Sequence, residues 1–160
     1  MKSVLISIHP KWCELIRELL GYENRRPLYK KRLDLRKSAP KTVPFKAYIY
    51  ETQGKTDTPF IDEDGHYNFK GGGLVIGEFV CDYVVRHCET ENAYLVEEMS
   101  CVSREDILKY SNGKEVFGWH ISGLKIYDKP RELSEFSKYG FGHPTPLKRP
   151  PQSWMFVEEL

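Results

Sequence analysis

The stretch YKKRLDLRKSAP, residues 29–40, is typical of a β-strand that carries its charges on one face. Successive side chains of a strand point to opposite sides of the sheet. Leu33 and Leu35 would therefore share the face that anchors the strand in the core. Asp34 and Arg36 would share the other face, close enough to interact.

Positive charge is concentrated in this part of a chain that is almost neutral overall. The protein has 24 basic and 23 acidic residues, a formal net charge of +1. Between residues 25 and 41 there are eight basic residues and one acid, Asp34, so 16 basic and 22 acidic residues remain elsewhere. Such a patch predicts an anionic partner at one place. The alternative is a solvated loop, as most charge runs are.

Length and composition favour one domain spanning residues 1–160, without a membrane segment. No apolar run approaches the roughly 20 residues needed to cross a bilayer. The opening MKSVLISIHPKW has Pro10 and Trp12 where a signal-peptide cleavage site would be expected, so we reject a leader. We expect a cytoplasmic protein.

The four cysteines, Cys13, Cys81, Cys88 and Cys101, form no CxxC pair and are expected to be reduced thiols. A zinc set can be drawn from His87 and three of these cysteines. Its spacing matches no ligand pattern, so we predict no metal and no cofactor.

Hydrophobic patterning predicts strands separated by polar loops, with few helices. Strands are expected at 4–8, 32–36, 45–52, 74–87, 117–128 and 154–160, the fifth with a slip at Ser122–Gly123. A helix with Pro10 in its first turn should end near Gly21, and another should follow the N-cap Ser103 at 103–111. Residues 21–30 and 53–73 are expected to be loops, and 128–152 irregular with a helical turn at ELSEF.

This order leaves too few crossover helices for a doubly wound parallel sheet. We predict an α+β, mostly β fold, in the form of a small, mostly antiparallel barrel with two or more flanking helices. Closure of the barrel would also remove exposed sheet edges.

Several segments together resemble the ASCH family of the PUA-like superfamily. SIHPKWCELI (7–16) is similar to the entry into the first helix of these domains. The family motif G-x-K-x-x-E-x-R reads YKKRLDLR here: Lys31 and Arg36 match, Asp34 stands for Glu and Tyr29 for Gly. VIGEFVCD (75–82) and GWHISGLKIYDKP (118–130) look like later barrel strands. The resemblance covers most of the chain.

The resemblance implies a PUA-like pseudobarrel with a ligand cleft between the first helix and the barrel. Family members are thought to bind RNA or DNA there. Some remove an acyl group from N4-acetylcytidine, and one is a ribonuclease. Two departures matter here: the loop GYENRRPLYK (21–30) looks longer than usual, and Asp34 has a shorter reach than Glu.

The first functional hypothesis is binding of nucleic acid, RNA above all, or of a nucleotide. A base pocket needs a flat wall, polar groups for the base edge and cations for phosphate. Trp12 or Trp119 would form the wall, unless either is simply a core residue. The base edge would be read by His9, Asp34, His120 and Ser122. The phosphates would be held by Lys11, Arg25, Arg26, Arg36 and Lys37, and Lys31 would be a further binding residue.

The second hypothesis is a small hydrolase of modified nucleosides, an amidohydrolase of the N4-acetylcytidine type, or a ribonuclease in the same cleft. Its catalytic residues would be Lys31, Asp34 and Glu78. Relatives that remove acyl groups have a hydroxyl residue where this chain has Asp34, which argues against a direct copy. Lys31 beside Asp34 is expected to stay protonated, because an opposite charge favours the ammonium. The pair would then suit ligand holding better than proton transfer.

A structural alternative remains for Asp34 and Arg36, which could form only an ion pair that orders the strand. Such a pair is worth about 0–1 kcal/mol when it is exposed. Both roles are compatible, because Asp34 can orient the Arg36 guanidinium toward a ligand while it stabilises the strand.

Overall fold

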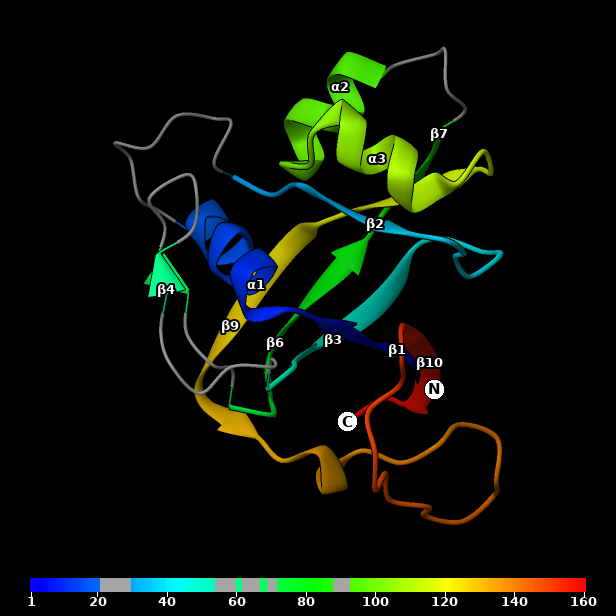
Figure 1. Ribbon diagram of the computed structural model, residues 1–160. Helices are drawn as coiled ribbons and strands as arrows, with labels where there is room; N and C mark the ends of the chain where they lie inside the picture. The colour runs from blue at the N-terminus through cyan, green and yellow to red at the C-terminus, as the bar shows by residue number, and fades with distance from the viewer. Residues whose placement is uncertain (21–29, 54–59, 62–66, 69–71, 88–92) are drawn as a thin grey trace. The chain divides into compact units, whose positions relative to one another are not determined.

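The computed structural model describes residues 1–20, 30–53, 60–61, 67–68, 72–87 and 93–160 (Figure 1). The chain divides into two compact units, each built from separate segments, and each is described by itself. The first unit contains Met1–Glu14, Lys46–Phe79 and Lys125–Leu160. The second unit contains Leu15–Phe45 and Val80–Leu124.

A five-stranded sheet has the strand order β10-β1-β3-β6-β9. Its central pairing is parallel, with Val4 of β1 opposite Ala47 of β3, whereas β1 and β10 run antiparallel. The strand bounds are β1 Lys2–Ile8, β3 Phe45–Glu51, β6 Leu74–Cys81, β9 Ser122–Arg131 and β10 Trp154–Glu158. β1, the first strand of the chain, therefore lies between β3 and the last strand, β10.

The core of the first unit gathers large apolar side chains around β1 and β3. Tyr48 packs edge-to-face on Phe136, with ring centroids 4.9 Å apart. The buried members of this cluster are Leu5, Tyr48, Tyr50, Val75, Phe136, Leu147 and Val157. Phe136 directly follows the short 3-10 helix η3 (Leu133–Glu135), at the predicted helical turn.

A three-stranded antiparallel sheet, β2-β8-β7, organises the second unit. Its strands are β2 Leu33–Arg36, β8 Val116–His120 and β7 Val84–His87. Helices α2 (Ala93–Ser100) and α3 (Arg104–Ser111) contribute to one apolar cluster with β2. Its buried members are Leu33, Val96, Met99 and Ile107.

The remaining helices and strands are short. Helix α1 (Pro10–Arg17) continues as the 3-10 helix η1 (Glu18–Leu20), in agreement with the predicted helix. β4 (Phe60–Ile61) and β5 (Tyr67–Asn68) pair as a small hairpin within the segment predicted to be a loop. No described helix is long and apolar enough to cross a membrane.

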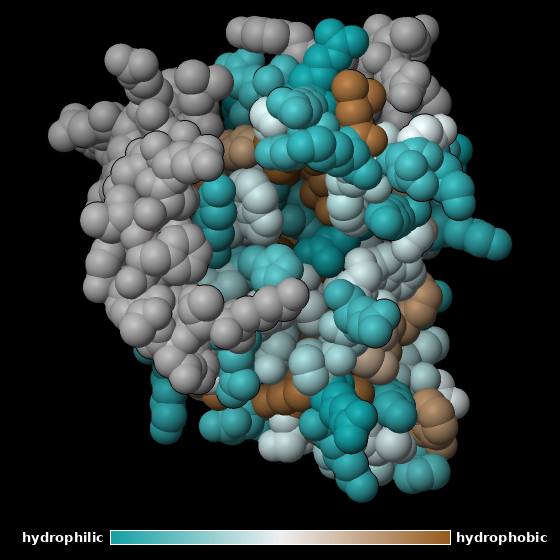
Figure 2. Space-filling view, viewed as in Figure 1, coloured by the Kyte–Doolittle hydropathy of each residue, from teal (hydrophilic) through white to brown (hydrophobic). Residues whose placement is uncertain are grey.

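The α+β, mostly β class predicted from the sequence is confirmed. The described strands form separate sheets and do not hydrogen-bond into a closed ring. The N-cap of α3 is also confirmed, because the Asp106 N–H donates to Ser103 Oγ at 3.2 Å. Hydrophilic residues cover much of the face seen in the space-filling view, with small hydrophobic patches among them (Figure 2).

The single strand predicted at 74–87 is wrong. Asp82 and Tyr83 interrupt it, and the two halves, β6 and β7, belong to different sheets. The strand predicted at 117–128 likewise divides at Ile121 into β8 and β9. Gly123, near the predicted slip, has a φ of +55°, which a residue with a side chain rarely adopts. Helix α2 was not predicted.

Gly77 of β6 is required by the close approach of β9, and we predict that Gly77→Ala destabilises the protein by about 1–3 kcal/mol or more. An added Cβ would overlap the Lys125 carbonyl oxygen and lie 3.1 Å from Ile126 Cα, both backbone atoms. The measurement is denaturant unfolding. Gly72→Ala is the matched control, since its Cβ would meet only the Leu74 side chain at 3.6 Å. Equal unfolding midpoints for the two variants would contradict the prediction.

Candidate functional site

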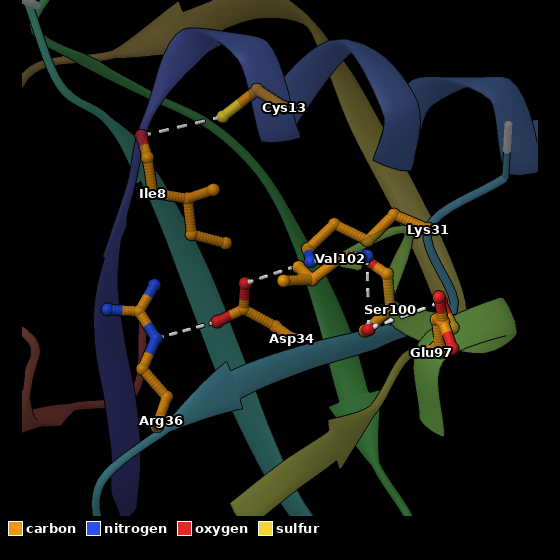
Figure 3. A network of polar contacts seen from close by, with 8 residues as sticks. All are labelled: Ile8, Cys13, Lys31, Asp34, Arg36, Glu97, Ser100 and Val102. Atoms are coloured by element: carbon orange, nitrogen blue, oxygen red, sulfur yellow. Dashed lines mark hydrogen bonds and ion pairs between the residues drawn. The ribbon is translucent and has the colours of Figure 1, made fainter. Parts of the chain in front are cut away.

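Strand β2 holds Asp34 and Arg36 on one face, as the alternation of the sequence predicted. Its pairing with β8 places Asp34 opposite Trp119 and Arg36 opposite Phe117. Arg36 Nε donates a hydrogen bond to Asp34 Oδ2 at 2.6 Å (Figure 3). The side chains are 12% and 5% exposed, so this charge-assisted bond is largely shielded from water.

Lys31, just before β2, is buried to 1% relative exposure. Its ammonium donates to the Ser100 carbonyl oxygen at 2.7 Å and lies 4.0 Å from Asp34 Oδ1. Ser100 is the last residue of α2, where the helix carbonyls and dipole favour a cation. The Lys31 backbone N–H donates to the Leu15 carbonyl, which fixes the chain as it enters the strand.

A tight turn at the end of α2 positions the carbonyl oxygen that accepts the hydrogen bond of the Lys31 ammonium. Cys101 has a φ of +60°, in the left-handed region, and its N–H donates to the Glu97 carbonyl at 3.1 Å. The Val102 N–H donates to Ser100 Oγ at 3.3 Å. These bonds hold the Ser100 carbonyl oxygen near the Lys31 ammonium (Figure 3).

Lys31, Asp34 and Arg36 together form what we name the charged cluster: two cations, one carboxylate and a net charge of +1. The solvated-loop alternative does not hold for Lys31 and Asp34, since both are buried. The value for an exposed ion pair also underestimates the contribution of Asp34 to stability, because breaking a buried pair by removing one partner costs about 3–5 kcal/mol. The carboxylate is therefore essential to the packing of the cluster.

Burial lowers the pKa of Lys31 below its ordinary value of 10.5, and the nearby Asp34 charge offsets only part of this effect. Asp34 does favour the ammonium, as expected, but burial has the larger effect on the pKa of Lys31. Desolvation disfavours the ammonium more than one carboxylate at 4.0 Å favours it. This property moves Lys31 toward the range in which an amine exchanges protons.

A second cluster in the same unit contains His120, Asp82 and Tyr83. A 2.6 Å hydrogen bond joins His120 Nδ1 to Asp82 Oδ1, and the imidazole stacks on the Tyr83 ring at 4.3 Å. Burial acts to raise the pKa of Asp82, but the hydrogen bond and charge of His120 and the backbone hydrogen bonds together outweigh it, so the pKa is lowered. Asp82 and Tyr83 were not singled out from the sequence, which placed them inside a continuous strand.

Trp119 is fully buried, so its predicted role as a stacking wall is wrong and the core alternative holds. Its Nε1 donates to the Ser38 carbonyl at 3.2 Å, and its ring packs edge-to-face on Phe45. The ring has no surface left for a base. Ser122 donates its hydroxyl proton to the Val80 carbonyl at 2.7 Å.

Other candidates lie in the first unit. His9 is exposed, with Nδ1 3.4 Å from Thr52 Oγ1. Lys11 lies over the partly buried Trp12 ring at 5.2 Å. Glu78 is 3.1 Å from the Lys46 ammonium and accepts a hydrogen bond from the Tyr127 hydroxyl at 3.0 Å. These residues belong to the first unit and the charged cluster belongs to the second, so their part in a common site remains a prediction.

Lys37 in the second unit is exposed, and its ammonium lies 5.1 Å from the centre of the Tyr110 ring. Arg25 and Arg26, predicted to hold phosphates, lie outside the described residues.

Comparison with known proteins identifies relatives by structure. No family model matches the sequence, and no curated protein matches it. The crystal structure of ASCH from Zymomonas mobilis is similar, with a TM-score of 0.64 at 16% identity, over 98% of this chain and 88% of that chain. A serine-to-alanine mutant of that protein has a TM-score of 0.63 at 17% identity, over 98% and 89%. A tyrosine-to-phenylalanine mutant has a TM-score of 0.62 at 15% identity, over 99% and 92%. The chain therefore has the ASCH-domain fold.

The lowered pKa of Lys31 predicts a pH-dependent contribution to stability. Between the folded pKa and 10.5 the unfolded chain holds a proton that the folded lysine has released. Folding is thus favoured increasingly as pH rises through this window. The unfolding free energy of the wild type minus that of Lys31→Met should rise with alkaline pH, by at most about 1.4 kcal/mol per pH unit.

Denaturant unfolding of both proteins across the alkaline range measures this difference. Groups that do not interact with Lys31 titrate alike in both proteins and cancel in the subtraction. The pKa of the Cys101 thiol depends on Lys31, so both proteins carry Cys101→Ser. A difference that stays flat or falls with pH would mean that burial does not lower the pKa of this lysine.

Proposed function

We propose that the protein binds nucleic acid, RNA above all, or a nucleotide, through a basic cleft that includes the charged cluster. The observation that carries the proposal is the Arg36 guanidinium, held at 2.6 Å by a buried carboxylate beside a buried ammonium. The ASCH fold and the match of Lys31 and Arg36 to the family motif support the same conclusion. We place the cleft between the first helix and the strands of a single domain, residues 1–160.

The electrostatics of the charged cluster favour an anionic ligand. Its two cations outweigh one carboxylate, and charge attraction is stronger in a shielded site than in water. The Arg36 side chain is 12% exposed, whereas the Lys31 side chain is only 2% exposed, so Arg36 is the cation that contacts a ligand. A planar guanidinium matches phosphate oxygens and base edges in two-pronged geometry. Asp34 fixes its orientation, and Lys31 keeps the cluster positive.

The remaining candidates have supporting roles in this proposal. Trp12 is the aromatic wall, and His120 contributes to reading the base edge. Phosphates are contacted by Lys11, Arg25, Arg26 and Lys37, with His9 and Ser122 as further polar groups.

One observation favours a second candidate, a hydrolase of the N4-acetylcytidine type, or a ribonuclease, in the same cleft. The pKa of Lys31 is lowered, and a lysine serves as a general base only when its pKa is well below 10. In this role Lys31 takes up the proton, Asp34 positions the ammonium that forms, and Glu78 is the third catalytic group.

The binding function is tested with Arg36→Gln and a fluorescent short oligouridylate. Loss of one phosphate contact should weaken binding and reduce the slope of log affinity against log salt by about 0.7. Fluorescence anisotropy between about 50 and 200 mM salt measures both quantities. The matched control is Lys109→Gln, a cation in the same unit whose side chain is 72% exposed. Unchanged affinity and slope in a folded Lys31→Gln/Arg36→Gln double variant would overturn the proposal.

The hydrolase candidate predicts release of cytidine from N4-acetylcytidine by the purified protein. Chromatography of the nucleosides measures the release, which Lys31→Met should abolish while its far-ultraviolet circular dichroism stays native. Absence of cytidine with the wild-type protein would remove the amidohydrolase candidate and leave the binding function unaffected.

A further inference from the structure

A second basic region lies in the first unit, between η3 and β10. From Phe136 to Val157 the sequence contains no Asp or Glu, but it contains Lys138, Lys148 and Arg149. We name residues 138–151 the basic loop. All three cations are exposed, and Lys148 and Arg149 form no ion pair with a described carboxylate.

The basic loop is ordered by contacts at both of its ends and by a hydrogen bond within it. Phe136 and Leu147 are buried in the core of the first unit, at 0% and 3% exposure. Within the loop, the Lys138 N–H donates to the Thr145 carbonyl at 3.0 Å, so the chain returns on itself. Farther along, the Pro151 carbonyl accepts a hydrogen bond from Ser7 Oγ at 2.7 Å. The wide turn between η3 and β10 is visible in Figure 1.

The loop borders a hollow of about 560 Å³ that has cations but no carboxylate on its wall. Lys138, Lys148 and Arg149 line it, together with apolar surface from Pro150, Pro151 and Met155. Lining of this kind combines positive charge with flat apolar surface, and the volume falls within the range of small-ligand sites.

Two aromatic rings stand exposed on the same loop. Tyr139 is 43% and Phe141 is 53% exposed. The Lys138 ammonium lies 6.0 Å from the Phe141 ring, and the Lys2 ammonium of β1 lies 5.7 Å from the Tyr139 ring. Each exposed ring therefore has a cation beside it.

The carboxylate that contacts the loop backbone is already engaged. Glu158 of β10 pairs with the N-terminal ammonium at 3.4 Å and accepts the Gly140 N–H at 3.3 Å. Its carboxylate orders the loop backbone.

From these features we infer that the basic loop is a separate binding surface for single-stranded nucleic acid. Cations that track phosphates, interleaved with aromatic rings on which bases stack, are the combination that binds a single strand without sequence preference. A duplex offers phosphates but keeps its bases stacked inside, so the rings would contribute little to its binding.

This surface does not depend on the charged cluster, which lies in the second unit. The two proposed sites can therefore be tested independently of one another. RNA and DNA single strands share the chemistry that the loop recognises, and both serve as probes.

The test uses the full chain and fluorescent oligouridylate, oligothymidylate and a duplex of matched length, followed by anisotropy. Lys148→Gln/Arg149→Gln should reduce the salt slope for both single strands by about 1.4, which is two contacts at about 0.7 each. Phe141→Ala should weaken single-strand binding by about five-fold or more and leave duplex binding unchanged.

The matched control is Lys125→Gln/Lys129→Gln on β9, which removes the same charge from exposed positions of the same unit. Equal salt slopes for the two double variants would overturn the inference. So would an equal loss of single-strand and duplex binding in Phe141→Ala, since that result would exclude base stacking. A loss confined to Arg36→Gln would support the charged cluster and reject the basic loop, and the opposite pattern would do the reverse.

Discussion

A lysine ammonium that is almost closed off from water must find its partners inside the protein, and the second unit is arranged around this requirement. Lys31 obtains the Ser100 carbonyl from the end of α2 and the Asp34 carboxylate from β2. Asp34 is in turn shared with Arg36. The end of α2 and strand β2 thus both contact the Lys31 ammonium. The Arg36 guanidinium, at the edge of the cluster, is held in a fixed position by Asp34. Structural stability and the proposed ligand recognition therefore depend on the same carboxylate.

Much of the fold could be predicted because local patterns in the sequence determine its helices and strands. Alternation identified β2, and Ser103 marked the beginning of α3. The break between β6 and β7 could not be predicted, because apolar residues continue on both sides of Asp82 and the change of sheet is a long-range effect. Helix α2 has no acidic first turn and no basic last turn. It is eight residues long and is stabilised by the packing of Val96 and Met99, since short helices are marginal alone.

The site was predictable to the extent that strand geometry governs it. Residues two apart share a face, so the contact between Asp34 and Arg36 followed from the sequence. The burial of Lys31 did not follow, because its carbonyl partner is 69 residues away and belongs to the helix that was missed. For the same reason the balance between desolvation and attraction was misjudged. Trp119 illustrates a simpler limit: periodicity places a ring on the core face but does not show whether one edge stays exposed.

The chain passes back and forth between its two units, and this has a practical consequence for dissecting the protein. One unit is assembled from three separate segments and the other from two. No continuous fragment consists of one unit alone, because the shortest stretch that holds the whole second unit, residues 15–124, also includes residues 46–79 of the first. Half-length fragments cut through both units, so loss of activity in such a fragment would not locate that activity. Assigning roles to the two units requires single side-chain replacements in the intact polypeptide.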